Sequence, residues 1–403
     1  MYIQPAEGFG GAERQGVLHI RRLKDLGFDV LPVVGPGRPI CDALEEHGVT
    51  DYVFFDEFFC EVDRPLTLLE SVTRELEQWR ILVVLQQRLR RLLRERNIDL
   101  VFASRSFGWV LASRLAHAMR LPLVWRGGSR TTKWSQTLAL RAFAGVWGPD
   151  ALICNCEAVR IGLAPLVNCP SFIVPNGVDT DRFDPAKVKP RFREELGLGP
   201  DVPVVGFAAR PAPEKGMEFL AQVILGASRE VPELRVLVGG EFGWRQRYEE
   251  MFAGMGLGDR VRFLGHVRDV ESVYKSSDAI VLTSRNNSIE GSPNAVLEAM
   301  AMARPVVATR VGGLAEAVEH GVEGFLAGHE DVPGFTHYLV QLLRDRDLRQ
   351  RMGAAGRDTI LRRFSDWSVA GRLSSVLRSV AARAALRRAP GGAPRPYVDL
   401  RAD

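Results

Sequence analysis

The chain has 403 residues, of which 46% are hydrophobic and 25% are charged, and its formal net charge is +4. This composition is typical of a globular protein and excludes a disordered or fibrous chain. Acids and bases are interleaved along the sequence, which argues against a dedicated nucleic-acid binder. The length favours two domains, because a single hydrophobic core stops growing at about 250–300 residues.

Two further observations concern the location of the protein. No apolar run approaches the roughly 18 residues of a membrane-spanning helix, and the start, MYIQPAEGFGG, lacks the basic and apolar segments of a signal peptide. The five cysteines are scattered, which is not a disulfide framework. We therefore expect a cytoplasmic protein. We interpret the C-x-C pair Cys154 and Cys156 as flanking the end of a buried strand, and we expect no metal site.

Short apolar runs alternate with helical patterns, which is typical of parallel sheets built from βαβ units. A first strand at 1–4 precedes a glycine-rich segment, and it is either truncated or begins upstream of this sequence. The other predicted strands of the first half are 28–34, 100–103, 121–125, 151–154 and 171–174. Those of the second half are 202–208, 234–239, 261–264, 279–283, 305–309 and 324–327. The two series predict an α/β fold with two doubly wound, Rossmann-like domains.

The domain boundary is predicted within 175–200, where proline, glycine and aspartate cluster. We expect an N-terminal domain at 1–180 that binds the acceptor of the reaction inferred below and a C-terminal domain at 181–365. A helix at 366–387 is expected to return to the N-terminal domain, and the tail 388–403, rich in proline and glycine, is expected to be flexible.

The segment 80–96 departs from the even distribution of charge. It carries six arginines against one glutamate, with leucines at helical spacing at positions 82, 85, 89, 92 and 93. One interpretation is a basic amphipathic helix that lies on an anionic membrane surface. The other is a helix that packs its leucines against the protein and leaves its arginines in water.

Two glycine-rich turns open predicted helices, and a helix N-terminus offers amides and a positive dipole end to a phosphate. The first contains Gly10 and Gly11, although a tight turn needs glycines with or without a ligand. The second runs from Glu290 to Glu298 and leads into a helix that begins near Asn294. The two carboxylates suit the paired hydroxyls of a sugar, and taken alone they are equally consistent with surface charges.

A basic pair follows the first strand of the second half. Arg210 and Lys215 lie in the loop after 202–208, at the carboxyl edge where open α/β sheets bind ligands. There they are suited to neutralising a diphosphate. The alternative is a pair of solvated loop charges.

These segments together resemble the family 4 retaining glycosyltransferases, which have the GT-B fold of two Rossmann-like domains facing across a deep cleft. The resemblance rests on GFAARPAPEKGMEFL, LRVLVGGE, VRFLGHVRDVESVYKSSDAIVLTS and EGSPNAVLEAMAMARPVVATRVGGLAEAVEHGVEGFL. Upstream it includes GGAER, ICNCEAVR and VPNGVDTDRF. It covers nearly the whole chain and is weaker between positions 36 and 151.

The resemblance implies the roles of individual residues. Arg210 and Lys215 would hold the donor diphosphate, Glu290 the hydroxyls of the transferred sugar and Glu298 the ribose. The nucleotide base would lie near His266 and Val267. The full set of implied donor-binding residues is Gly10, Gly11, Arg210, Lys215, His266, Val267, Glu290, Gly291, Ser292, Asn294, Ala295 and Glu298, with Arg210, Lys215 and Glu290 as the catalytic ones.

The resemblance also implies a reaction. A sugar would pass from a UDP-, GDP- or ADP-sugar to a glycan or glycolipid with retention of configuration, without a cofactor or a required metal. No carboxylate pair is placed as in a double-displacement glycosidase. Two alternatives remain open: a catalytically silent subunit that binds the nucleotide sugar, and an epimerase on the same fold.

Two positions depart from the family pattern. Many relatives have a histidine after the strand at 121–125, where this chain has Arg126, and a glycine where it has Ala303. If position 303 needs a positive φ, alanine costs about 1 kcal/mol. We expect the acceptor to meet the N-terminal domain, with Arg105, Arg126 and Arg130 available to an anionic acceptor. Solvated arginines are the alternative.

Overall fold

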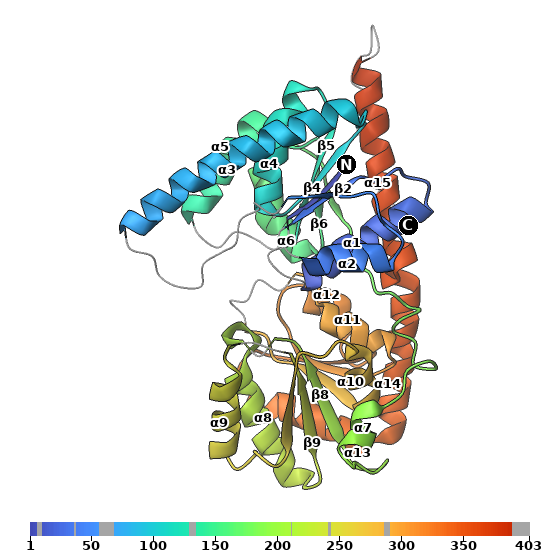
Figure 1. Cartoon of the computed structure of the whole chain (residues 1–403). Helices are drawn as coiled ribbons and strands as arrows, with labels where there is room; N and C mark the ends of the chain where they lie inside the picture. The colour runs from blue at the N-terminus through green and yellow to red at the C-terminus, as the bar shows by residue number, and fades with distance from the viewer. Residues whose placement is uncertain are drawn as a thin grey trace. The chain divides into compact units, whose positions relative to one another are not determined.

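The computed structural model describes residues 1–5, 10–35, 38–55, 68–128, 134–210, 212–240, 243–285 and 291–388 (Figure 1). Of 68–79, 134–136 and 388 it describes the backbone alone. The chain divides into two compact units. The first comprises 1–154, 160–174 and 370–403, and the second comprises 155–159 and 175–369.

The first unit is built on a parallel sheet. Its strands are β1 (Tyr2–Pro5), β2 (Pro32–Gly35), β3 (Val53–Phe54), β4 (Val101–Ser104), β5 (Leu123–Gly127), β6 (Ala151–Cys154) and β7 (Ser171–Ile173). They lie in the order β3-β2-β1-β4-β5-β6-β7. The chain therefore adds strands on one side of β1 and then on the other, which makes the sheet doubly wound.

Helices follow these strands in turn. They are α1 (Gly11–Asp25), α2 (Arg38–Glu46), α3 (Leu68–Glu95), α4 (Arg105–Ala118), α5 (Trp134–Trp147), α6 (Glu157–Leu163) and the short turn η1 (Ala164–Leu166). The indole of Trp125 on β5 stacks on that of Trp109 on α4, with ring centroids 4.9 Å apart. Such aromatic burial fixes α4 against one face of the sheet.

The helix α3 decides between the two interpretations of its leucines. Leu85, Leu89 and Leu93 are buried, so the apolar stripe packs within the protein, and α3 contacts α4. The six arginines between positions 80 and 96 are all exposed. Val83 and Val84 are also exposed, at 50% and 43%. These three leucines are therefore not available to a membrane, whereas Leu82 and Leu92 are half-buried, and the exposed arginines make the solvent side of α3 basic between positions 80 and 96.

The second unit is built on a separate parallel sheet. Its strands are β8 (Val204–Ala208), β9 (Arg235–Gly239), β10 (Val261–Gly265), β11 (Ala279–Leu282), β12 (Val306–Thr309) and β13 (Gly324–Ala327). Their order is β10-β9-β8-β11-β12-β13. The predicted α/β class with two doubly wound sheets is confirmed.

The helices of the second unit enclose this sheet. They are α7 (Arg191–Glu195), η2 (Pro213–Lys215), α8 (Met217–Glu230), α9 (Arg245–Gly254), α10 (Val270–Ser276), α11 (Asn294–Ala301), α12 (Leu314–Ala317), α13 (Val332–Arg344), α14 (Arg346–Thr359) and η3 (Ile360–Phe364). The last helix, α15 (Asp366–Arg388), begins in this unit and belongs to the first unit from Ala370 onward.

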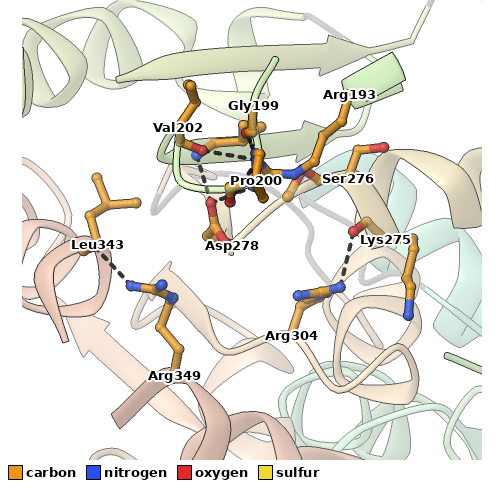
Figure 2. A network of polar contacts seen from close by, with 12 residues as sticks. Arg193, Gly199, Pro200, Val202, Lys275, Ser276, Asp278, Arg304, Leu343 and Arg349 are labelled. Carbon is orange, nitrogen blue, oxygen red and sulfur yellow. Dashed lines mark hydrogen bonds and ion pairs between the residues drawn. The ribbon is translucent and has the colours of Figure 1, made fainter. Parts of the chain in front are cut away.

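A polar network fixes the start of the second sheet (Figure 2). Arg193 on α7 forms an ion pair with Asp278 at 2.7 Å and donates to the carbonyls of Gly199 and Val202. The same Asp278 carboxylate accepts the amide of Val204, the first residue of β8, at 2.8 Å. One charge pair therefore ties the segment that enters the unit to the amino ends of β8 and β11.

The helix α11 ends as the family resemblance led us to expect. Ala303 has a φ of 53°, in the left-handed region where an L-residue with a Cβ is strained. This residue follows the C-cap of α11, at Met302, where glycine is favoured. Ala303 therefore places a small backbone strain at the carboxyl end of α11, the helix whose amino end is predicted to bind the donor.

We expect Ala303→Gly to raise the free energy of unfolding by about 1 kcal/mol, because glycine adopts this φ without strain. Chemical denaturation measures the change. The control is Ala354→Gly at an exposed position inside α14, which should lower stability by about 1 kcal/mol. Equal destabilisation by both substitutions would contradict the assignment of strain to position 303.

Candidate donor-binding site

The second sheet reverses its winding between β8 and β11. The strands after β8 are added on the β9 side, whereas β11, β12 and β13 lie on the other side. In open α/β sheets the crevice at such a reversal, outside the carboxyl ends of the strands, is where ligands bind. The loops that follow β8 and β11 are therefore the first place to look for the site.

The loop after β8 is held against the end of β11 by its backbone. Thr283 donates its hydroxyl to the carbonyl of Lys215 at 2.8 Å, and the amide of Arg285 donates to the carbonyl of Glu214 at 3.0 Å. Gly216 has a φ of 68°, and a Cβ added there would lie 2.1 Å from the Thr283 carbonyl oxygen. Glycine is thus required both for the conformation and for the close approach.

The loops after β9 and β10 join this edge. Gly240 has a φ of 149°, and a Cβ there would lie 2.4 Å from the carbonyl oxygen of Ala209. Its amide donates to the carbonyl of Gly265 at 2.9 Å. Arg210, which follows β8, is exposed beside Gly240. His266, directly after β10, is exposed as well. The loops at the carboxyl ends of β8, β9 and β10 are therefore in direct contact with one another. We call this edge of the sheet the rim, and Arg210 and His266 lie on it.

The amino end of α11 lies at the same edge. Gly291 packs so closely on the loop after β12 that a Cβ on Gly313 would lie 2.1 Å from the Gly291 carbonyl oxygen. Ser292, Asn294 and Ala295 are half-buried and retain contact with solvent. The first amides of an α-helix have no partner within the helix, so this turn has the chemistry of an anion site.

Glu298 lies one turn further along α11, and its carboxylate is held by a residue of α10. The hydroxyl of Tyr274 on α10 donates to its Oε2 at 2.7 Å. Tyr274 is fully buried, whereas Glu298 is half-buried. One carboxylate oxygen is thus fixed by a phenol that solvent cannot reach, which orients the group toward the surface.

The structure brings most of the predicted donor-binding residues of the second unit to one edge. Glu290 lies outside the described residues, and so does Arg130 of the predicted acceptor set. The residues at the edge are Arg210, Lys215, His266, Val267, Gly291, Ser292, Asn294, Ala295 and Glu298. Two further residues that sequence reasoning missed are Tyr274 and Asn176. Neither follows a recognisable turn, and each contacts the α11 region from a distant part of the sequence.

Three predicted residues of the first unit, Gly10, Gly11 and Arg105, follow the strands at its own reversal, between β1 and β4. Gly10 caps α1, and its amide donates to Glu13 Oε2 at 2.9 Å. The other oxygen of Glu13 accepts Arg105 Nη1 at 2.8 Å. Arg105 has a φ of 65°, a strained conformation that often marks functional positions. Gly11 follows as the exposed first residue of α1.

Arg126 on β5 is buried, at 5% exposure, so the solvated alternative is wrong for this residue. Burial lowers the pKa of its guanidinium, with the phenol of Tyr2 and the thiol of Cys154 opposing the change. His19, whose Nδ1 lies 3.1 Å from the Tyr2 hydroxyl, has a pKa well below its ordinary value because of burial and of Arg126. Burial, reinforced by the charge of Arg126, therefore disfavours the protonated form of His19.

In the part of the chain that the structure describes, no three His, Cys, Asp or Glu side chains are grouped to hold a metal ion. Within the same residues, every helix is too short or too polar to cross a bilayer.

Two family matches span both units. Residues 9–182 match the family described as Glycosyltransferase Family 4, and residues 202–345 match that described as Glycosyl transferases group 1. The chain belongs to the family 4 glycosyltransferases. The second match contains all the predicted donor-binding residues of the second unit, from Arg210 to Glu298.

Curated relatives match part of the glycosyltransferase. It is 32% identical over 212 residues to the GDP-mannose-dependent alpha-(1-6)-phosphatidylinositol monomannoside mannosyltransferase of Mycolicibacterium smegmatis, covering 51% of this chain and 55% of the relative. It is 33% identical over 196 residues to the D-inositol 3-phosphate glycosyltransferase of Corynebacterium jeikeium, covering 46% of each. These matches span about half the length of the relatives.

Solved structures match nearly the whole chain. HepE of Anabaena in complex with UDP has a TM-score of 0.76 at 21% identity, with 94% of this chain and 99% of that chain covered. Sucrose-phosphate synthase of Thermosynechococcus elongatus has a TM-score of 0.74 at 18% identity, with 94% and 98% covered. The fold is therefore GT-B, as the sequence predicted.

We expect Gly216→Ala to lower the free energy of unfolding by more than about 3 kcal/mol, because its Cβ meets a backbone oxygen that cannot rotate away. The matched control is Gly197→Ala, which has a φ of 60° and nothing within 4 Å of the added Cβ. It should cost only about 1 kcal/mol. Urea denaturation of both variants makes the comparison, and similar losses would contradict the close approach at Gly216.

Proposed function

We propose that this chain is a retaining glycosyltransferase that moves a sugar from a nucleoside-diphosphate sugar to a glycan or glycolipid acceptor. The observation that carries the proposal is the hydrogen bond from the Thr283 hydroxyl to the Lys215 carbonyl. It joins the loop after β8 to the segment that runs from β11 to the amino end of α11. A cation and a helix N-terminus at one sheet edge match the charge of a diphosphate.

Each side chain of the rim then has a role. The α11 amides with Lys215 and Arg210 bind the diphosphate and stabilise the charge that grows on it as the bond to the sugar breaks. Glu298, held by Tyr274, accepts the ribose hydroxyls, and Glu290 accepts hydroxyls of the transferred sugar. The base lies against the backbone at His266 and Val267.

Retention follows from attack on the face that the leaving group occupies. The bond between the sugar C1 and the phosphate oxygen breaks, and its electron pair goes to that oxygen. The acceptor hydroxyl oxygen bonds to C1 on the same face, and its proton passes to the departing phosphate. The protein then contributes positioning and charge stabilisation, with neither a metal nor a cofactor required.

The acceptor is assigned to the first unit. Relatives are named for phosphatidylinositol mannoside and inositol 3-phosphate substrates, which are anionic. Arg105 and Arg130 have the charge to meet such an acceptor, and the guanidinium suits phosphate through paired donors. Arg126, which is buried on β5, contributes its charge from beneath the surface. We place the enzyme in the cytoplasm, at the inner membrane surface where a glycolipid acceptor is found.

The proposal is tested with a panel of UDP-, GDP- and ADP-sugars and lipid or glycan acceptors. Lys215→Ala should lower kcat/KM at least about 100-fold, because the leaving diphosphate loses a cation, and Glu290→Ala should abolish transfer. Lys189→Ala, at an exposed position, serves as the control. Nucleotide binding without turnover from any donor would favour a silent subunit, and release of an epimerised donor would favour an epimerase.

Membrane contact is tested separately on α3. We expect Arg88→Gln, Arg90→Gln and Arg94→Gln together to weaken binding to anionic phospholipid vesicles on the order of 100-fold, since each arginine near the surface contributes about 1 kcal/mol. Cosedimentation with the vesicles measures this change in binding.

The charge-matched control for α3 replaces three exposed arginines of the second unit, Arg346, Arg351 and Arg362, with glutamine. If this control weakens vesicle binding as much as the α3 variant does, the contact is nonspecific.

A further inference from the structure

The chain passes from the first unit into the second between Val174 and Pro175. We call Pro175–Val178 the connecting segment. The amide of Val178 donates to the carbonyl of Phe364 at 2.9 Å, and the amide of Asp366 donates to the carbonyl of Val178 at 2.9 Å. The connecting segment is therefore bonded to the start of α15, through which the chain returns to the first unit.

Asn176 extends from the connecting segment to the amino end of α11. Its Nδ2 donates to the Ser292 carbonyl at 3.2 Å and to Asn294 Oδ1 at 2.6 Å. Its backbone amide donates to the Ser292 hydroxyl at 3.2 Å. The side chain is buried, at 7% exposure. One residue thus makes three bonds to a turn that follows it by more than a hundred positions.

Another segment of the chain is linked to the same turn through the loop that opens α12. Residues 155–159 belong to the second unit, and Glu316 on α12 accepts the amides of Glu157 and Ala158 at 2.8 and 3.0 Å. The loop that opens α12 contains Gly313, which packs on the Gly291 carbonyl. The turn from Gly291 to Asn294 is therefore in contact, directly or through one loop, with two of the segments that link the units.

We propose that Asn176 is a positioning residue that holds the Ser292–Asn294 turn in the conformation that binds the donor diphosphate. This inference rests on the proposed function, which places the diphosphate at the α11 amides. Asn176 touches no substrate in this account. It acts by fixing the carbonyl of Ser292 and the side chain of Asn294, so that the amides that follow them face the ligand.

An amide is the side chain that this place requires. Both acceptors that it meets, a backbone carbonyl and Asn294 Oδ1, need a donor, and only Nδ2 supplies two N–H groups to them. Aspartate has the same shape and no donor, so Asn176→Asp sets a carboxylate against the Ser292 carbonyl. In such a buried setting one hydrogen bond changes a binding constant by about a factor of ten at most. A buried acceptor left without a donor has a larger effect.

The test compares binding of nucleoside diphosphates with binding of the nucleosides alone, by calorimetry for UDP, GDP and ADP and by NMR titration for uridine, guanosine and adenosine. Asn176→Asp should raise the Kd of the diphosphate that the wild-type protein binds about tenfold and leave the Kd of its nucleoside unchanged. Ser292→Ala removes the acceptor of the Asn176 amide together with a hydroxyl of the predicted donor-binding set, and it should raise the same Kd at least about threefold with the fold intact.

The control is Asp181→Asn, at an exposed position in the segment that follows, which should change neither Kd. Unchanged diphosphate binding in both test variants, or equal losses for diphosphate and nucleoside, would overturn the positioning role and leave the proposed function standing. Failure of the wild-type protein to bind any of UDP, GDP and ADP would overturn the proposed function and this inference with it.

Discussion

The structure of the candidate site depends on one close approach, that of the β8 loop to the exit of β11. Gly216 lies where a Cβ would be 2.1 Å from the Thr283 carbonyl oxygen, and Thr283 returns a hydrogen bond to Lys215. Because backbone meets backbone, the loop that carries Lys215 is held against the end of β11 more rigidly than a flexible loop would be. The same principle recurs where Gly313 meets Gly291, so the rim is assembled from loops in direct contact.

Sequence reasoning located this rim through local patterns. The six strands of the second sheet are short, bounded by turns and, apart from β10, largely buried, and the predicted bounds of each agree within two residues. Arg210 and Lys215 were found because they directly follow a strand. The two-residue strand β3 was missed, since so short a run has no periodicity. Part of the segment predicted as 28–34 precedes β2, which begins at Pro32.

What the sequence did not provide are the contacts between distant segments. Tyr274 reaches Glu298, and Asn176 reaches Ser292 and Asn294, across loops and helices. No spacing rule connects such pairs, because their proximity is created by the order of the strands. The sequence likewise does not indicate that Arg126 is buried, since an arginine at a strand end is normally expected to face solvent. The roles of Glu290 and Arg130 stay predictions, because both lie outside the described residues.

The central claim is that the β8–β11 edge of the second unit binds the diphosphate of a sugar nucleotide. A crystal structure with UDP or GDP bound tests it most directly. The account predicts the β-phosphate within hydrogen-bond distance of Lys215 Nζ and of the backbone amides that open α11. A nucleotide bound with its phosphates at any other edge, with Lys215 directed away from them, would contradict it.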